Sequence, residues 1–258
     1  MRLFPALTRA ALPALLALPV QAAQVPTQAQ STPAPLSARQ AAAAMGMNDA
    51  AAIGKVMLDE LELGGGDAGI SAAWEAQAWY GTDYNKLWLK SEGEWFAGSA
   101  AQGRYEALWD RAALRWWDAQ AGIRYDLGRG PSRGWAALGV QGIAPYNFDL
   151  EATLYLGEAG RTAARVRVEH DLLFTQRLIL QPELETDLYG RSDPARRIGA
   201  GVSDLQLALR LRYEIRRELA PYLGVVWRRE FGGTARLDSA RGGDPDVLQW
   251  VAGAHIWF

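Results

Sequence analysis

Residues 248–258 read LQWVAGAHIWF, and this stretch decides the fold. Every second residue from Leu248 to Phe258 is apolar, whereas the alternate face includes Gln249 and His255. Side chains of a β-strand point alternately to its two faces, so the pattern predicts an amphipathic strand. Chain termini usually fray, and a soluble strand seldom ends in a buried aromatic residue. Two structures are therefore weighed: the closing strand of an outer-membrane β-barrel and the last strand of a soluble β-sandwich.

The same alternation recurs from about Lys55 onward, in about twelve segments of roughly ten residues, an even number as bacterial barrels require. Residues 204–214 show it clearly, because leucines alternate there with Asp204, Arg210 and Arg212. The longer connections, rich in Gly, Pro, Arg and Asp, alternate with short ones and fall at residues 128–134, 190–202 and 232–246. Short periplasmic turns and long outer loops are the arrangement of an outer-membrane barrel.

The charged faces of these strands favour a barrel when they are read together with the rest of the chain. A charged residue on the lipid face costs roughly 2–4 kcal/mol at the bilayer midplane, so these faces must line the lumen. The eleven Trp residues suit aromatic girdles at the two membrane interfaces. We predict an all-β fold, an antiparallel transmembrane β-barrel of about twelve strands, in which Phe258 acts as the membrane assembly signal.

The N-terminal region has the features of a secretory signal peptide. Arg2 and Arg9 precede an apolar run over residues 10–20, and Val20-Gln21-Ala22 fits the small-residue cleavage rule. A transmembrane anchor is the alternative, but the run is too short and is broken by two prolines. A stretch rich in Ala, Gln, Pro, Ser and Thr follows, which lacks the apolar residues needed to fold. The predicted divisions are a signal peptide (1–22), a disordered periplasmic linker (23–53) and an outer-membrane β-barrel (54–258).

Composition excludes several classes of function. The net charge is −2 and the pI is about 5.8, so the chain lacks the basic footprint of a nucleic-acid-binding protein. The chain has no Cys, which excludes disulfides and thiolate metal sites.

Several motifs stand out from about residue 56 onward: GTDYNKLWLKSEG at 81–93, WDAQAG at 117–122, TQRLILQP at 175–182 and LRYEIRRE at 211–218. Together they resemble the outer-membrane copper resistance protein B family. The resemblance implies a copper-associated barrel in the outer membrane of a Gram-negative bacterium, acting with periplasmic copper-handling proteins. Family members often carry a Met- and His-rich segment before the barrel. Only Met45 and Met47 remain of such a segment here.

The candidate copper ligands are Met45, Met47, Met57 and His255. Thioethers suit Cu(I), whereas imidazole and carboxylate suit Cu(II). Met57 opens the first predicted strand near the periplasmic mouth, and His255 faces the lumen near the same end by its place in the alternation. The alternative for Met45 and Met47 is two chance methionines in an Ala-rich linker.

Acidic residues on the lumen face have two interpretations. The candidates are Glu92, Glu94, Asp126 and Glu185. They line a path for cations, or they form cross-strand ion pairs with lumen arginines such as Arg165 and fill a narrow barrel.

The function predicted from these features is copper homeostasis and resistance, by binding copper ions or by moving them across the outer membrane. The alternative is a general narrow diffusion porin without a copper role. An enzyme is disfavoured, because a lipase needs a Ser–His pair oriented by a third group, and neither His170 nor His255 has a suitably placed Ser. Outer-membrane proteases work at the extracellular rim, whereas His255 is expected at the opposite end.

Overall fold

A computed structural model describes residues 37, 40–41, 44–45, 51–67, 69–97, 101–128 and 130–258 of the chain. The chain divides into two compact units, Met1–Gly46 and Met47–Phe258. The predicted signal peptide, most of the predicted linker and Met47 lie outside the described residues. No helix in the described ranges is both long and apolar enough to cross a membrane.

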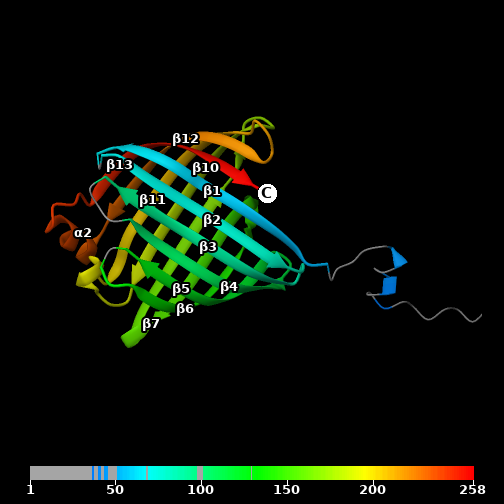
Figure 1. The fold of residues 1–258 in the computed structure, drawn as a ribbon, viewed down its shortest axis with the longest axis horizontal. Helices are drawn as coiled ribbons and strands as arrows, with labels where there is room; N and C mark the ends of the chain where they lie inside the picture. The colour runs from blue at the N-terminus through cyan, green and yellow to red at the C-terminus, as the bar shows by residue number, and fades with distance from the viewer. Residues whose placement is uncertain are drawn as a thin grey trace, which may run out of the picture. The chain divides into compact units, whose positions relative to one another are not determined.

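The described strands of the second unit form a closed antiparallel ring (Figure 1). Each strand pairs with its neighbours in sequence, β10 pairs with β8 and β11, and β13 pairs with β1. The two-residue β9 (Leu172–Leu173) lies beside β10 where β8 has ended. The remaining twelve strands are β1 (Ile53–Gly66), β2 (Ser71–Gly81), β3 (Asn85–Phe96), β4 (Gln102–Leu114), β5 (Trp117–Leu127), β6 (Arg133–Ala144), β7 (Phe148–Gly157), β8 (Arg161–His170), β10 (Leu178–Tyr189), β11 (Gly201–Tyr213), β12 (Leu219–Glu230) and β13 (Asp246–Trp257). The predicted fold, a barrel of about twelve antiparallel strands, is confirmed.

The seam between β13 and β1 closes the ring. Met57 pairs with Trp257, and the backbones of Val56 and Phe258 exchange hydrogen bonds of 3.1 and 2.8 Å. The pairing of β1 shifts register on both sides, between Leu58 and Glu60 against β2 and between Leu58 and Glu62 against β13. This irregularity interrupts the alternation, which explains why the first strand has the weakest pattern in the sequence although it is 14 residues long.

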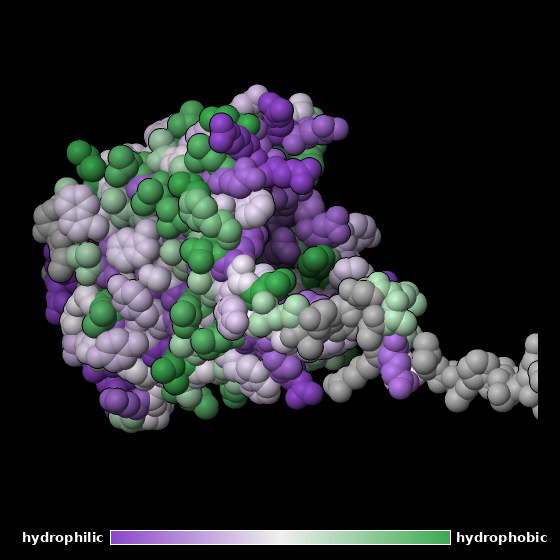
Figure 2. All heavy atoms as spheres, turned by 45° about the vertical axis from the view of Figure 1, so that its right-hand side comes forward, coloured by the Kyte–Doolittle hydropathy of each residue, from purple (hydrophilic) through white to green (hydrophobic). Residues whose placement is uncertain are grey.

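The two faces of the wall have opposite chemistry. The outer face is apolar, and its exposed residues include Leu138, Leu154, Leu223 and Trp250. Figure 2 shows apolar side chains spread over this outer wall and hydrophilic ones around a hollow at one end. Most of the buried polar residues lie on strands and face the lumen, and among the described residues they outnumber the members of the two buried apolar clusters. The interior of the barrel is therefore a polar network rather than a hydrophobic core.

The two ends of the barrel differ. We call the end where β1 begins and β13 finishes the terminal mouth, and the opposite end the loop mouth (Figure 1). The two longest connections, residues 190–200 and 231–245, both lie at the loop mouth and are two of the three predicted to be long. The third, at residues 128–132, is also at the loop mouth but is short. One terminal-mouth connection, residues 171–177, is longer than predicted because it contains β9.

The loop mouth is partly covered by α2 (Gly232–Ser239), a helix that the sequence reading did not predict. Thr234 of α2 is buried, and its Oγ1 accepts a hydrogen bond of 2.9 Å from the Gly199 backbone N–H. A Cβ on Gly199 would collide with the backbone of Gly233 and Thr234, so the close approach of the two long loops requires glycine. An eight-residue helix gives too little periodicity to be recognised in the sequence.

A salt bridge at the loop mouth joins β6 to the connection between β10 and β11. Arg133 donates a hydrogen bond of 2.8 Å from Nε to Oδ2 of Asp193, and Arg161 Nε lies 3.6 Å from the same oxygen. Burial alone would raise the pKa of the Asp193 carboxyl, but the hydrogen bond from Arg133 and the nearby positive charges outweigh burial and lower it. The Asp193 carboxyl is therefore ionised in this salt bridge.

We expect Leu209→Arg, in the middle of the outer face of β11, to destabilise the barrel by about 2–4 kcal/mol, because it places a charge in hydrocarbon. Urea unfolding of the lipid-inserted protein measures this loss. Tyr84→Arg, in the exposed turn between β2 and β3, is the matched control and should leave stability almost unchanged. Equal effects of the two substitutions would contradict a lipid-facing outer wall.

We expect Phe258→Ala to reduce the amount of barrel in the outer membrane several-fold, because Phe258 ends the closing strand as an exposed aromatic residue at the seam. Quantitative blotting of outer-membrane fractions provides the measurement. Phe174→Ala removes another exposed aromatic side chain from the turn before β10 and serves as control. Wild-type levels of Phe258→Ala would exclude the residue as the assembly signal.

Candidate functional site

The lumen is crossed at mid-height by arginine side chains that reach carboxylates on distant strands. Arg167 on β8 makes two contacts with Glu75 on β2, one of them from Nη2 to Oε2 at 2.6 Å. Its Nη2 lies 3.9 Å from Glu60 on β1, and its Nε lies 2.7 Å from Glu169 and 3.5 Å from Glu183. One guanidinium group therefore faces four carboxylates that come from β1, β2, β8 and β10.

A second arginine, Arg210 on β11, continues this layer. Its Nε and Nη2 contact Glu62 and Glu60 at 2.7 Å each, and its Nη1 contacts Glu183. The Arg210 side chain is only 3% exposed, and that of Glu183 is equally buried. Arginine suits this role because its planar group presents five donors that remain charged when buried.

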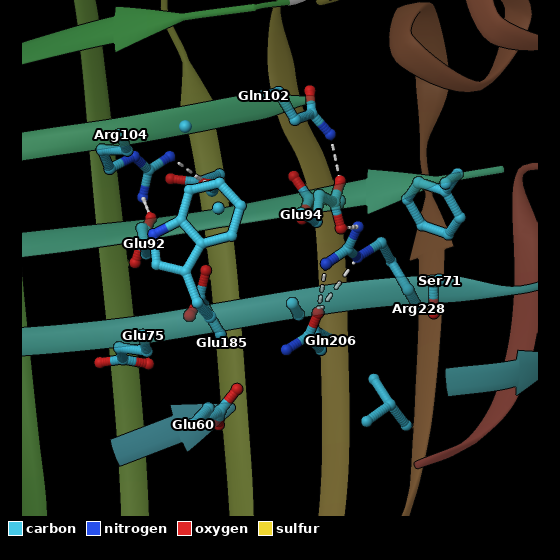
Figure 3. Close-up of a pocket in the computed structure, with 18 of the residues that line it drawn as sticks. Glu60, Ser71, Glu75, Glu92, Glu94, Gln102, Arg104, Glu185, Gln206 and Arg228 are labelled. Atoms are coloured by element: carbon cyan, nitrogen blue, oxygen red, sulfur yellow. Dashed lines mark hydrogen bonds and ion pairs between the residues drawn. The ribbon is translucent and has the colours of Figure 1, made fainter. Parts of the chain in front are cut away.

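A second group of contacts surrounds Glu92, which lies beside Arg104 in Figure 3. Arg104 contacts Glu92 at 2.9 Å on the adjacent strand β3 and Asp187 at 3.0 Å on β10, across the lumen. Arg165 joins Glu92 at 2.7 Å to Glu185 at 2.6 Å. Glu92 thus receives two guanidinium groups, and the contacts link opposite walls.

The two other predicted acidic residues, Asp126 and Glu94, are also held by arginines. Asp126 accepts hydrogen bonds of 2.7 and 3.0 Å from Arg124 and one of 3.0 Å from Trp135 Nε1. Glu94 on β3 contacts Arg228 on β12 at 2.6 Å (Figure 3). All four acidic candidates, Glu92, Glu94, Asp126 and Glu185, therefore lie in ion pairs, and those of Glu92, Glu94 and Glu185 join different strands.

Two separate cavities occupy the lumen. The larger, of about 470 Å³, opens toward the terminal mouth and includes Trp88, Glu151 and His255 in its wall. The smaller, of about 270 Å³, lies toward the loop mouth and is lined there by residues such as Ile198 and Thr234. Four residues line both cavities: Glu60, Glu75, Arg167 and Glu183. We call these four residues the septum, because they stand between the two cavities.

His255 lies in the wall of the terminal-mouth cavity, as the alternation of its strand predicted. Its Nδ1 is 3.3 Å from the backbone oxygen of Asp59 and 3.6 Å from the Asp59 carboxylate. The Asp59 carboxylate also accepts a hydrogen bond from Gln77, whose Oε1 accepts one of 2.8 Å from Trp88 Nε1. Nε2 of the imidazole forms no hydrogen bond with the part of the chain that the structure describes.

The described methionine candidates, Met45 and Met57, belong to different units of the chain. Met57 lies on β1 at the terminal mouth and pairs with Trp257 and Gln77, so it is two residues from His255 along the neighbouring strand. Met45 belongs to the first compact unit and is 69% exposed. The tertiary structure therefore brings His255 to Asp59, with Met57 at the same mouth.

Among the described residues, no group of three or more His, Asp or Glu side chains is arranged to hold a metal ion. The ion pairs explain why no such group is present among these residues, because arginines contact the carboxylates that would otherwise be free ligands. The lumen offers dispersed donors, such as His255 and the carboxylates of the terminal-mouth cavity, rather than one tight site. Dispersed weak sites suit an ion in transit, since conduction requires release as well as binding.

Several residues of this site were not singled out from the sequence. Glu60 and Glu62 lie on the irregular strand β1, where the shifted register hides their orientation. Glu75 follows the alternation of β2 and was recognisable as a lumen residue, but its partner Arg167 is 92 residues away along the chain.

Comparison with known proteins places the chain in a family. The family model for the copper resistance protein B precursor (CopB) matches residues 52–258. The chain is 43% identical over 203 residues to copper resistance protein B of Escherichia coli. The alignment covers 79% of this chain and 69% of the relative. It is 44% identical over 214 residues to a copper resistance protein B homolog of Pseudomonas syringae pv. tomato, covering 82% of this chain and 72% of the relative.

Among solved structures, the NanC porin aligns with a TM-score of 0.54 at 11% identity, over 77% of this chain and 98% of the porin. This likeness concerns the barrel fold alone. The fold and the family together place the protein in the outer membrane of a Gram-negative bacterium. With the family model covering the whole barrel and both relatives above 40% identity, the chain belongs to the copper resistance protein B family.

Proposed function

We propose that the barrel serves copper resistance by binding copper ions at its terminal mouth and passing them through the lumen across the outer membrane. The observation that carries the proposal is His255, an imidazole in the wall of the terminal-mouth cavity of a barrel from a copper resistance family. Imidazole and carboxylate oxygen are ligands that suit Cu(II), and carboxylates such as Asp118 and Glu169 line the same cavity.

The methionines have a separate role in this proposal. Met45 and Met47 precede the first strand by a few residues, and Met57 lies within it near its start. Thioethers prefer Cu(I), so these residues would capture the reduced ion. His255 and the lumen carboxylates Glu92, Glu94, Asp126 and Glu185 would offer later and weaker contacts. A set of modest sites allows an ion to leave as well as to enter.

The proposal also sets the orientation of the barrel. In this proposal residues 1–22 are a signal peptide that is removed, the residues from 23 up to the first strand are a linker in the periplasm, and the barrel begins with β1 at Ile53. The terminal mouth then faces the periplasm, where copper-handling proteins would exchange ions with it. The long connections face outward, as is usual for bacterial barrels. The proposal assigns the barrel no catalytic step.

We expect cells that carry His255→Ala to show altered copper tolerance and cellular copper content, in the same direction as cells that lack the protein. The reason is that the substitution removes the imidazole of the terminal-mouth cavity. His170→Ala is the matched control, because His170 stacks on Phe148 at a ring distance of 4.6 Å and does not line the described cavities. Growth in graded copper and elemental analysis of washed cells are the measurements. If loss of the whole protein changes neither quantity, the copper function is wrong.

We expect Met45→Ala/Met47→Ala to weaken Cu(I) binding by the full-length protein and to leave Cu(II) binding at His255 in place, because thioethers are soft ligands. Competition with a Cu(I) chelator, beside a Cu(II) titration of the same sample, separates the two ions. Unchanged Cu(I) affinity would mean that these two methionines are chance residues of an Ala-rich linker. Bilayer conductance without copper binding would instead favour a diffusion porin.

A further inference from the structure

The septum is the point at which the described lumen is divided. Glu60, Glu75, Arg167 and Glu183 line both cavities, and the contact of Arg167 with Glu75 crosses the lumen between β8 and β2. Three of these four residues are acidic, and the fourth is the arginine that contacts all three. The division between the cavities is therefore made by side chains rather than by backbone.

Of the four septum residues, Arg167 reaches farthest across the lumen. It starts on β8, and its two contacts with Glu75 end on β2 at the opposite side of the ring. Its side chain is 13% exposed, whereas that of Glu75 is 17% exposed, so both remain accessible from the cavities. Glu60 and Glu183 are also held by Arg210, which does not line the terminal-mouth cavity.

The charges around Arg167 are unbalanced. Its guanidinium group faces Glu60, Glu75, Glu169 and Glu183, and Arg210 is shared with two of these. Two positive charges therefore meet five carboxylates, because Arg210 also contacts Glu62. If the Arg167 side chain moves aside, Glu75 and Glu169 lose their arginine and a passage lined by negative charge remains. Rings of acidic side chains are the usual basis of cation selectivity in channels.

We propose that Arg167 is the side chain that closes the lumen, and that its withdrawal opens a cation-selective passage between the two cavities. The inference rests on the proposed function only in taking the lumen as the ion path. Closure follows because a bidentate arginine–carboxylate contact joins opposite walls. Selectivity follows because the carboxylates that Arg167 leaves behind attract cations and repel anions.

The test is conductance in planar lipid bilayers in KCl, without copper, using the full-length protein. We expect Arg167→Ala to raise the single-channel conductance by about tenfold, with a reversal potential in a KCl gradient that shows preference for K⁺. Arg167→Lys keeps the charge but loses the bidentate contact, so its conductance should lie between those of Arg167→Ala and wild type. Wild-type conductance for Arg167→Ala would overturn the proposal.

Removing Arg167 alone leaves buried carboxylates without their partner, which can prevent folding. Arg167→Ala/Glu75→Ala removes both members of the contact and should open the lumen with a weaker preference for cations. The heat-dependent gel shift typical of folded barrels verifies that each variant is assembled. If this folded double variant also keeps wild-type conductance, Arg167 does not close the lumen.

Lys90→Ala/Glu151→Ala is the matched control. Lys90 contacts Glu151 at 2.7 Å from β3 to β7, so it is another ion pair between distant strands, and both residues line the terminal-mouth cavity alone. This variant should keep wild-type conductance. An equal rise would show that closure is spread over the lumen, and the proposal for Arg167 would fail. Because the currents are carried by KCl, failure here leaves copper binding untouched, and failure of copper binding leaves the conductance result standing.

Discussion

Everything in this structure depends on the requirement that backbone polar groups in a bilayer find their hydrogen bonds inside the protein. A sheet satisfies this requirement only when it closes, because an open edge would leave N–H and C=O groups in hydrocarbon. The seam between β13 and β1 provides the closure, and Val56 and Phe258 extend its hydrogen bonds to the end of the strand.

Closure also decides what the interior contains. The outer face must be apolar, so the alternate face of each strand receives the charged residues, and twelve such faces meet in a narrow lumen. The arginines then hold the strands together, as a hydrophobic core does in a soluble protein. Arg165 and Arg210 each join carboxylates from more than one strand and tie the walls together.

The same interior has consequences for ion movement. The contacts that brace the barrel occupy the carboxylates that would otherwise bind a metal, and the septum divides the lumen into two cavities. The terminal-mouth cavity has an imidazole in its wall, that of His255, whose Nε2 forms no hydrogen bond with any of the described residues. In the proposed function, uptake of an ion at the mouth and its passage through the septum are therefore distinct steps, governed by different residues.

The sequence by itself determined the barrel, the lumen face of each regular strand and the place of His255, because side chains alternate with a strict period of two. It did not determine the irregular register of β1, the short helix α2 or the partners of the charged residues. Arg167 and Glu75 are 92 residues apart and lie on strands that are not neighbours in the ring. Only the tertiary structure decides such pairs, because they depend on how the strands are staggered around the closed barrel and on how far each side chain reaches across it.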